Sequence, residues 1–502
     1  MIPSPVASPR DSRGTAAALG LAALLLPFSN GVTPLPLAAW LAPVFLLRFT
    51  RSRPARIGLP IAFALLAGAA LIEFRGMMPG PGLPPRLIGA VFALPAVIPY
   101  LVDRWLAPRL PVFAGTLVFP CAWVAMEYAM SLTPCATWGA VGYTQYGDLP
   151  LLQVISVTGP SGLTFLLAWL APVACALWEH GWGSPPARAA VAWFGGALAL
   201  VLALGELRVV LAPPRGPTVR VASFSRPLVG TDSTRHALGR LIRRGESPAD
   251  LREIVTREHA QAESLLARAA VEAGAGAKIV FWGEGNARDQ GRLVLFEDAR
   301  GRELARTGQI YLGMAISSWD RARRPPRENK LVLIDPGGAI AWQYLKTHPV
   351  IGAESRTIAG DGRLRTLDSP FGRLTTAICY DADFPALLGQ AGRLGADILI
   401  DPADDWEAID PLHTRMASFR AIEQGVNLVR QTSNGRSAAY DYEGHVLAEA
   451  DDFRARDRTM VAQVPIHGVR TVYARIGDLF AWAAIALLGW LGIRAARAPT
   501  AV

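Results

Sequence analysis

The chain has 502 residues, of which 51% are hydrophobic and 18% charged, with a formal net charge of +9. This length allows two or three domains. The basic charge does not indicate nucleic-acid binding, because many arginines lie in short loops between apolar runs, where they orient membrane proteins. The sequence also contains no zinc-ligand spacing, no Walker loop and no dinucleotide-binding glycine fingerprint, so we expect no metal site and no nucleotide.

Seven apolar runs in the first 215 residues are long enough, or nearly so, to cross a bilayer. They lie at 15–30, 34–49, 57–74, 87–107, 113–132, 155–178 and 189–212. No convincing cleavage site follows the first run, so we expect a retained helix rather than a signal peptide. An eighth run lies at 476–493. We therefore predict a membrane domain over 1–215 with about seven helices, and a transmembrane helix with a short tail over 471–502.

Arginines gather in alternate loops of this membrane region. They are Arg10, Arg13, Arg48, Arg51, Arg53, Arg56, Arg104, Arg109 and Arg188. The positive-inside rule places these loops in the cytoplasm. Seven crossings then deliver residue 216 to the outer face, and the eighth run returns the chain. The segment 216–470 is thus predicted to lie outside the cytoplasmic membrane and to be tethered at both ends.

Strand and helix patterns alternate within the segment 216–470. We expect strands at 218–224, 277–282, 310–319, 372–379 and 396–400, helices at 249–274, 383–394 and 413–425, and hairpins at 330–346 and 437–450. Such alternation is typical of a layered α/β sandwich.

Only one of the four cysteines, Cys379, lies in this segment. The other three lie in the apolar half, where a cysteine is usually a small buried hydrophobe, and no disulfide framework is implied. Cys379 is predicted to end a strand just before a helix, whose N-terminus favours a thiolate. By itself, the position is equally consistent with a buried structural cysteine.

Two other residues have chemistry that would assist a thiol. Glu284 follows a predicted strand in FWGEGN and could accept the thiol proton. Lys346 follows a hairpin and is one of three lysines among 50 basic residues; its compact ammonium could hold an oxyanion. Each of the two, taken alone, is more readily explained as a solvated surface residue. Glu354, eight residues beyond Lys346, indicates nothing alone.

Taken together, a glutamate, a lysine and a cysteine in this order resemble the Glu-Lys-Cys triad of the nitrilase superfamily. FWGEGN, AICYDADFP and FRAIEQGVNLVRQTSNGRS resemble segments of that superfamily. In the membrane half, FPCAWVAMEYAM (119–130) and residues 137–167 resemble the fifth and sixth helices of the apolipoprotein N-acyltransferases and their joining loop. This resemblance implies a multi-pass α-helical membrane domain plus a nitrilase-like α-β-β-α sandwich over 216–470.

The resemblance also implies a reaction in the bacterial inner membrane. A fatty acyl chain would pass from a membrane phospholipid, through a thioester on Cys379, to the N-terminal amine of a diacylglyceryl-cysteine lipoprotein. Glu284 would act as the base, and Lys346 would hold the oxyanion together with the backbone N–H of Tyr380. The chemistry needs no metal and no cofactor, and we expect a monomer.

Several residues are weaker candidates for supporting or substrate-binding roles. By resemblance, Glu354 would support the oxyanion side or position Lys346. Tyr380 and Asp381 follow Cys379 in AICYDADFP and are further supporting or substrate-binding candidates. His413 and Trp406 could line an acyl pocket or simply pack. Glu127 lies inside the fifth predicted span, where a carboxylate is costly unless it is paired.

The sequence departs from the family pattern near these loops. Gly283 replaces a proline, Gly352-Ala353-Glu354 replaces Phe-Gly-Glu, and Asp404-Asp405-Trp406-Glu407 replaces Asn-Asp-Ala-Trp-Phe-Gly. The loop 225–248 lacks the expected glutamine, asparagine and tryptophan. A tethered carbon-nitrogen hydrolase, an amidase with water as acceptor, is therefore an alternative function. A non-enzymatic lipoprotein-binding protein is a third alternative, which the intact triad disfavours.

Overall fold

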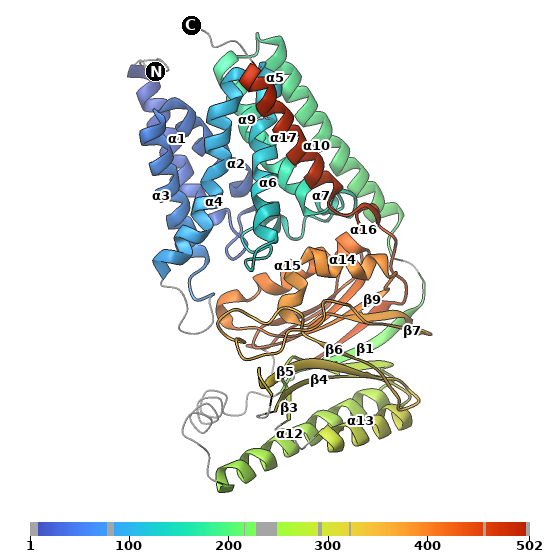
Figure 1. The fold of residues 1–502 in the computed structure, drawn as a ribbon. Coiled ribbons are helices and arrows are strands. Elements are labelled where there is room, and N and C mark those ends of the chain that lie inside the picture. Colours follow the sequence, from blue (N-terminus) through green and yellow to red (C-terminus); the bar gives the residue numbers. More distant parts are fainter. Residues whose placement is uncertain are drawn as a thin grey trace. The chain divides into compact units, whose positions relative to one another are not determined.

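The computed structural model describes residues 9–77, 85–214, 216–226, 248–289, 294–320, 323–454 and 458–497. The chain divides into two compact units, one formed by Met1–Pro213 with Thr471–Val502 and the other by Pro214–Arg470 (Figure 1). Most of the loop 225–248 lies outside the described residues, so the departure noted there has no structural counterpart here.

The first unit contains helices and no strand among its described residues. Its helices are α1 (Pro9–Leu25), α2 (Pro36–Ser52), α3 (Ala55–Glu73), α4 (Pro85–Leu106), α5 (Val112–Thr116), α6 (Val118–Ser131), α7 (Leu149–Leu152), α8 (Ile155–Thr158), α9 (Pro160–His180), α10 (Pro185–Leu211), α16 (Val472–Ile476) and α17 (Leu479–Arg497). Helices α9 and α10 begin at prolines, whose fixed φ suits the first helical position.

Among the described residues, six segments of this unit are long and apolar enough to cross a membrane, judged by length and composition alone. Five of them precede the second unit in the chain, and the sixth is α17. The sequence predicted eight spans. The two predicted spans that fall short correspond to α1 and α2, which have 17 residues each. Seventeen residues lie at the lower end of the length that spans a hydrocarbon core.

The C-terminal helix α17 packs back into the helical unit although more than 250 residues separate it from α10. Ala481 and Ala484 of α17 form a buried cluster with Cys121 and Val124 of α6. Small residues let two helix backbones approach closely, which is how helices associate in lipid. Cys121 therefore has the packing role that the sequence predicted for it.

The second unit contains two β-sheets. The first has the strand order β13-β1-β2-β4-β5-β6, with β3 paired to β4, and the second has the order β12-β11-β10-β9-β8-β7. The strands are β1 (Thr218–Phe224), β2 (Ile279–Trp282), β3 (Ala287–Asp289), β4 (Tyr311–Trp319), β5 (Arg327–Ile334), β6 (Ile340–Leu345), β7 (Thr366–Ser369), β8 (Gly372–Thr376), β9 (Ile398–Asp404), β10 (Asn427–Ser433), β11 (Arg436–Tyr440), β12 (Val446–Asp451) and β13 (Thr459–Pro465).

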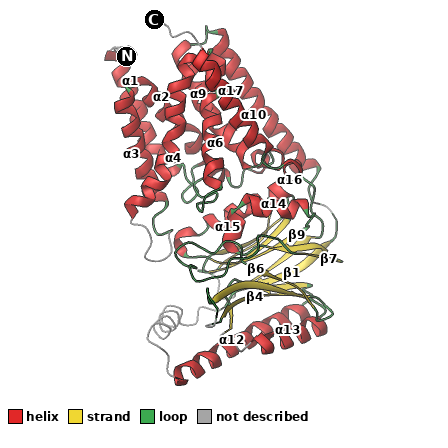
Figure 2. Cartoon of the chain, viewed as in Figure 1, coloured by secondary structure: helices red, strands yellow, loops and turns green. Residues whose placement is uncertain are grey.

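Helices cover the outer face of each sheet, as Figure 2 shows for this unit. Helices α12 (Pro248–Gly274) and α13 (Val294–Gly308) lie on the first sheet, and α14 (Pro385–Arg393) and α15 (Leu412–Gln424) lie on the second. The inner strands are mostly buried: all four residues of β2 and the first six of β9 are buried. The predicted α-β-β-α sandwich is therefore confirmed.

The predicted strand at 372–379 is too long. β8 ends at Thr376, three residues before Cys379, and a 3-10 turn occupies Cys379–Asp383. The helix that follows, α14, begins at Pro385 rather than at 383. Ala377 and Ile378 are apolar like the strand residues before them, so the sequence pattern did not mark the end of the strand. In the structure these two residues connect β8 to the turn.

Candidate active site

The three residues that the sequence singled out lie beyond strand ends. Glu284 follows β2, Lys346 follows β6, and Cys379 follows β8. The first two strands belong to one sheet and the third to the other. Their exposed fractions are 5%, 1% and 2%. Glu284 contacts Lys346 and the N–H of Asp404 in β9, and the N–H of Cys379 contacts Asp401 in the same strand, so the facing sheets bring the three groups into one buried region.

The Lys346 ammonium lies between two carboxylates. Its Nζ is 2.8 Å from Glu284 Oε1 and 2.8 Å from Glu354 Oε2. Burial lowers the pKa of a lysine, but Glu284, Cys379 and Glu354 raise the pKa of Lys346 well above its ordinary value. Burial likewise opposes ionisation of Glu354, yet Lys346 and Arg327 lower its pKa to about 2. At neutral pH this site therefore holds a permanent cation and a permanent anion.

Glu284 connects the two sheets. Its Oε2 accepts a hydrogen bond from the backbone N–H of Asp404 at 3.0 Å, and its own N–H donates to Ala403 O at 3.2 Å. Both partners belong to β9 of the second sheet. Burial raises the pKa of Glu284 above its ordinary value, although Lys346 opposes that shift. A carboxylate with a raised pKa is a better proton acceptor near neutral pH.

Asn329 is a member of this site that the sequence did not reveal. Its side-chain amide donates to Glu284 Oε1 at 2.5 Å and to Glu354 Oε1 at 2.9 Å. The backbone N–H of Lys346 donates to Asn329 O at 2.8 Å. Asn329 lies in the middle of β5, where an alternating strand pattern carries no signal for a site. Only the antiparallel pairing of β5 with β6 brings it beside Lys346.

Gly283 explains one departure from the family pattern. Its N–H donates to Phe224 O at 3.0 Å, a hydrogen bond that a proline would lose. A Cβ at this position would lie 2.8 Å from Ser433 Oγ and 2.9 Å from Asn286 Nδ2. Glycine at 283 thus allows the Glu284 turn to pack closely against neighbouring side chains.

Cys379 has a strained backbone. Its φ is +53°, in the left-handed region that non-glycine residues rarely adopt, and such strain is concentrated at functional sites. The N–H of Cys379 donates to Asp401 Oδ1 at 2.8 Å. That hydrogen bond holds the strained turn in place, and it commits the Cys379 N–H to Asp401 rather than to a substrate.

The expected depression of the Cys379 pKa is wrong. Burial and then Glu284 raise the pKa of this thiol well above its ordinary value, although Lys346 and Arg430 oppose the shift. Cys379 begins a five-residue 3-10 turn and does not lie at the N-terminus of an α-helix. The thiol is therefore protonated at rest, and a base must remove its proton before it can attack.

Asp381 forms hydrogen bonds with the segment that carries Lys346. Its Oδ2 accepts from the Tyr344 hydroxyl at 2.7 Å, and its Oδ1 accepts from the backbone N–H of His348 at 2.7 Å. It is fully buried. Asp381 thus connects the turn after Cys379 to the segment that carries Lys346; the supporting or substrate-binding role expected for it stays a prediction.

Tyr380 and Trp406 are both half-buried. The ring of Tyr380 lies edge-on to Phe384, with 5.0 Å between the ring centroids. Trp406 precedes the short turn Glu407–Ile409, which follows β9. Tyr380 directly follows Cys379, and Trp406 lies two residues after Asp404, the last residue of β9. The roles of Tyr380 and Trp406 toward a substrate stay predictions.

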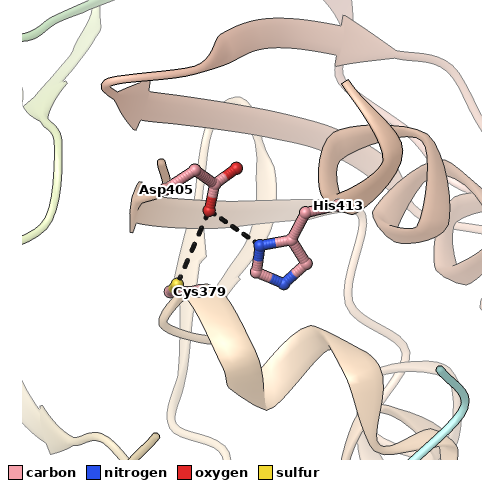
Figure 3. Close-up of side chains that lie close together, drawn as sticks. All are labelled: Cys379, Asp405 and His413. Carbon is pink, nitrogen blue, oxygen red and sulfur yellow. Dashed lines mark hydrogen bonds and ion pairs between the residues drawn. The ribbon is translucent and has the colours of Figure 1, made fainter. Parts of the chain in front are cut away.

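The ring nitrogens of His413 contact charged groups inside the second unit. Its Nδ1 is 2.7 Å from Asp405 Oδ1, and its Nε2 is 3.2 Å from Asp383. The same Asp405 oxygen is 3.9 Å from Cys379 Sγ, as Figure 3 shows. Burial lowers the pKa of a histidine, but Asp383 and Asp405 raise that of His413 to about 9. His413 is therefore an imidazolium at neutral pH.

Ligand atoms of Cys379, Asp405 and His413 lie within 4.8 Å of one another, a spacing that a metal ion could use. A cation is already present, however, because Arg430 Nη2 is 3.3 Å from Asp405 Oδ1 and 2.9 Å from His413 Nδ1. The imidazolium supplies a second positive charge. The arrangement is therefore a network of paired charges rather than a metal centre.

Comparison with known families matches both units of the chain. Residues 294–474 match the model of the carbon-nitrogen hydrolases, and residues 22–173 match that of the apolipoprotein N-acyltransferase N-terminal domain. The fold and these two matches define a carbon-nitrogen hydrolase domain joined to a membrane domain, within the nitrilase superfamily.

Curated relatives make the assignment more specific. An apolipoprotein N-acyltransferase of Geobacter metallireducens is 27% identical over 93% of this chain and 91% of its own length. One from Rhodopseudomonas palustris is 26% identical over 95% of both chains. The chain belongs to the apolipoprotein N-acyltransferase family and is an acyltransferase.

Two amidases also resemble part of the chain. A deaminated glutathione amidase of Dictyostelium discoideum is 28% identical over 30% of this chain and 60% of its own length. Among solved structures, a nitrilase-superfamily amidase from Nesterenkonia matches with a TM-score of 0.41 and 17% identity, covering 53% of this chain and 96% of that one.

Proposed function

We propose that this protein transfers a fatty acyl chain from a membrane phospholipid to the N-terminal amine of a diacylglyceryl-cysteine lipoprotein, through a thioester on Cys379. The observation that carries the proposal is the buried Lys346 ammonium, 2.8 Å from both Glu284 and Glu354. Glu284 and the ammonium act electrostatically on the buried Cys379 thiol, and Glu354 acts on the ammonium. This set supplies a nucleophile, a base and an oxyanion partner.

In the first half-reaction, Glu284 accepts the proton of the Cys379 thiol. The thiolate attacks the ester carbonyl of the phospholipid, and Lys346, with the backbone N–H of Tyr380, holds the oxyanion. The ester C–O bond then breaks. Glu284 returns its proton to the departing alkoxide, and lysophospholipid leaves while the acyl chain stays on Cys379.

In the second half-reaction, the lipoprotein amine attacks the thioester carbonyl. The same oxyanion partners hold the tetrahedral intermediate, Glu284 takes a proton from the amine, and the C–S bond breaks. The proton passes to the sulfur and restores the thiol. Glu354 keeps Lys346 charged and in place, and Asn329 holds both carboxylates.

The membrane location suits this chemistry, because both substrates are anchored in lipid. In the part of the chain that the structure describes, six helices are long and apolar enough to span a membrane. We propose the bacterial inner membrane, with the second unit on the periplasmic face. The arginine-rich alternate loops support this orientation. A single chain supplies Glu284, Lys346 and Cys379, so we expect a monomer to suffice.

An amidase activity is the alternative, and the Dictyostelium relative favours it. That relative matches only 30% of this chain, however, whereas the acyltransferase relatives extend over the membrane unit as well. The membrane unit has no evident use in hydrolysis of a water-soluble amide. Transfer is therefore the better supported of the two.

A transfer assay with defined substrates distinguishes the two activities. Purified protein in detergent is incubated with a phospholipid carrying a labelled acyl chain, together with a diacylglyceryl lipopeptide. Transfer predicts label on the lipopeptide amine and none with the Cys379→Ala variant. Ammonia release from simple amides, without labelled lipopeptide, would favour the amidase.

A further inference from the structure

A second cluster of buried charges lies beside Cys379, and the proposed mechanism does not use it. Asp405 Oδ1 is 2.7 Å from His413 Nδ1 and 3.3 Å from Arg430 Nη2. Arg430 also forms an ion pair with Asp401. These side chains are at most 3% exposed. Burying charges is costly, so a network of this kind beside a reactive thiol calls for an account of what it does.

The Cys379 thiol contacts this cluster directly. Its Sγ is 3.9 Å from Asp405 Oδ1, within reach of a hydrogen bond from sulfur. Among the described residues, this is the only hydrogen bond that the thiol makes. Figure 3 shows that one oxygen of Asp405 faces both the sulfur and the imidazole. The resting thiol therefore donates to Asp405 and not to Glu284.

His413 and Arg430 determine what Asp405 can do. Burial would raise the pKa of Asp405, but the imidazolium and the guanidinium lower it below its ordinary value. Asp405 consequently stays a carboxylate: it accepts a hydrogen bond from the thiol without taking its proton. A negative charge next to sulfur also disfavours the thiolate.

We propose that Asp405, clamped by His413 and Arg430, is a positioning residue that holds the Cys379 thiol and keeps it protonated until a substrate arrives. On activation, the S–H···Oδ1 contact breaks, the thiol turns toward Glu284, and Glu284 takes the proton as the C–S bond to the acyl chain forms. This inference rests on the proposed role of Cys379 as the nucleophile.

Protection of the thiol is a physical reason for such an arrangement. The thiolate, not the thiol, reacts with oxidants and with stray electrophiles. A site on the outer face of the membrane meets an oxidising compartment. A thiol that is hydrogen-bonded to an anion reacts slowly with oxidants in that compartment. The Cys379 thiol is released only when substrate and Glu284 replace its contact with Asp405.

Alkylation of Cys379 by iodoacetamide, followed by mass spectrometry of its peptide as a function of pH, tests the proposal. The charged groups that act on the sulfur, directly or through Asp405, are Glu284, Lys346, Asp383, Asp401, Asp405, His413 and Arg430. In the wild type we expect the rate to rise with a midpoint above about 8.5, the ordinary thiol value. A midpoint well below that value would overturn the proposal without any variant.

Two variants of similar size give opposite expectations. Asp405→Asn removes the negative charge, so alkylation at pH 7 should become about tenfold faster or more, equivalent to a shift of about one pH unit. His413→Gln removes the compensating cation while Arg430 keeps Asp405 ionised, so alkylation should become about threefold slower or more. A merely structural role predicts that both variants loosen the site and react faster. If the alkylation rate changes in the same direction in both variants, the proposal is overturned.

The same samples separate this inference from the proposed function. Thermal unfolding shows whether each variant is folded. If one is not, the pH profile of Cys379 alkylation in the wild type still tests the proposal. If Cys379→Ala still transfers acyl chains, the proposed nucleophile is wrong, while the alkylation rates still report on Asp405. If transfer depends on Cys379 but the two variants shift together, only the role of Asp405 is wrong.

Discussion

Lys346→Met removes the ammonium that lies between two buried carboxylates. Lys346 is 1% exposed, and its Nζ is the partner of both Glu284 and Glu354. Methionine has a similar length and no charge. The variant leaves Glu284 and Glu354 buried without their shared cation, with only the Asn329 amide between them.

The expected loss of stability follows from these contacts. Breaking a buried ion pair by removing one partner costs roughly 3–5 kcal/mol. In a domain of this size, each kcal/mol lowers Tm by about 2–4 °C, so we expect a fall of roughly 6–20 °C at pH 8. Acyl-enzyme formation should also be lost, because the oxyanion loses its cation.

The pH dependence of this loss has a definite sign. In the wild type, Lys346 has a raised pKa, so its stabilising contribution is present below about pH 10.4 and is lost only as pH rises through its folded value. Glu354, with a pKa of about 2, contributes stability above about pH 4.3 that is lost as pH falls through 2. In the variant both carboxylates can take up protons, so the difference in Tm should shrink between pH 8 and pH 5.

Thermal unfolding in detergent, followed by tryptophan fluorescence, measures this effect. Lys330→Met is the matched control, because Lys330 Nζ pairs at 3.1 Å with Glu328, a more exposed residue two positions earlier in the same strand β5, and Glu328 keeps Arg323 as a second partner. We expect it to cost about 1 kcal/mol or less. Equal losses for the two lysine variants, or a Lys346→Met loss that does not change with pH, would refute the reasoning.

Two further predictions concern residues that hold other groups in place. Asn329→Leu removes hydrogen bonds to two charged carboxylates, worth about 1.5–3 kcal/mol each. It should slow acyl-enzyme formation by about 10-fold to 100-fold in a single-turnover assay. Asn329→Asp adds a third negative charge and should slow acyl-enzyme formation further. Glu127→Leu leaves three donors, the Trp123 indole, the Val141 N–H and the Thr164 hydroxyl, without their acceptor. It should lower the free energy of unfolding by about 1–3 kcal/mol. Glu127→Gln keeps an acceptor oxygen and should cost less, so equal losses for the two variants would contradict this account.

The layered fold could be predicted because its signals are local. Helix and strand periodicity, together with turn residues, gave the hairpin formed by β5 and β6 and the helix α15, which ends at Gly425 with φ +70°. Glycine is the usual residue at such a left-handed helix end. The first two predicted spans fall short of the length of the other six, because their helices have 17 residues each.

The site was only partly accessible from the sequence. Glu284, Lys346 and Cys379 each follow an element end and resemble family motifs, so they could be named. Asn329 and Asp405 could not be given roles, because their importance arises from pairing between distant segments. The sign of the Cys379 pKa shift was wrong for a related reason. The helix-end argument considered local backbone, whereas burial and Glu284 decide the shift.

The central claim is that Cys379 carries the acyl chain, and trapping of the acyl-enzyme tests it most directly. Protein is incubated with phospholipid bearing a labelled acyl chain and no acceptor, then denatured and analysed for label removed by neutral hydroxylamine. We predict label on the wild type and on a Cys175→Ala control, whose cysteine is buried among helices, and none on Cys379→Ala. Thioester-linked label that persists on Cys379→Ala would contradict the account.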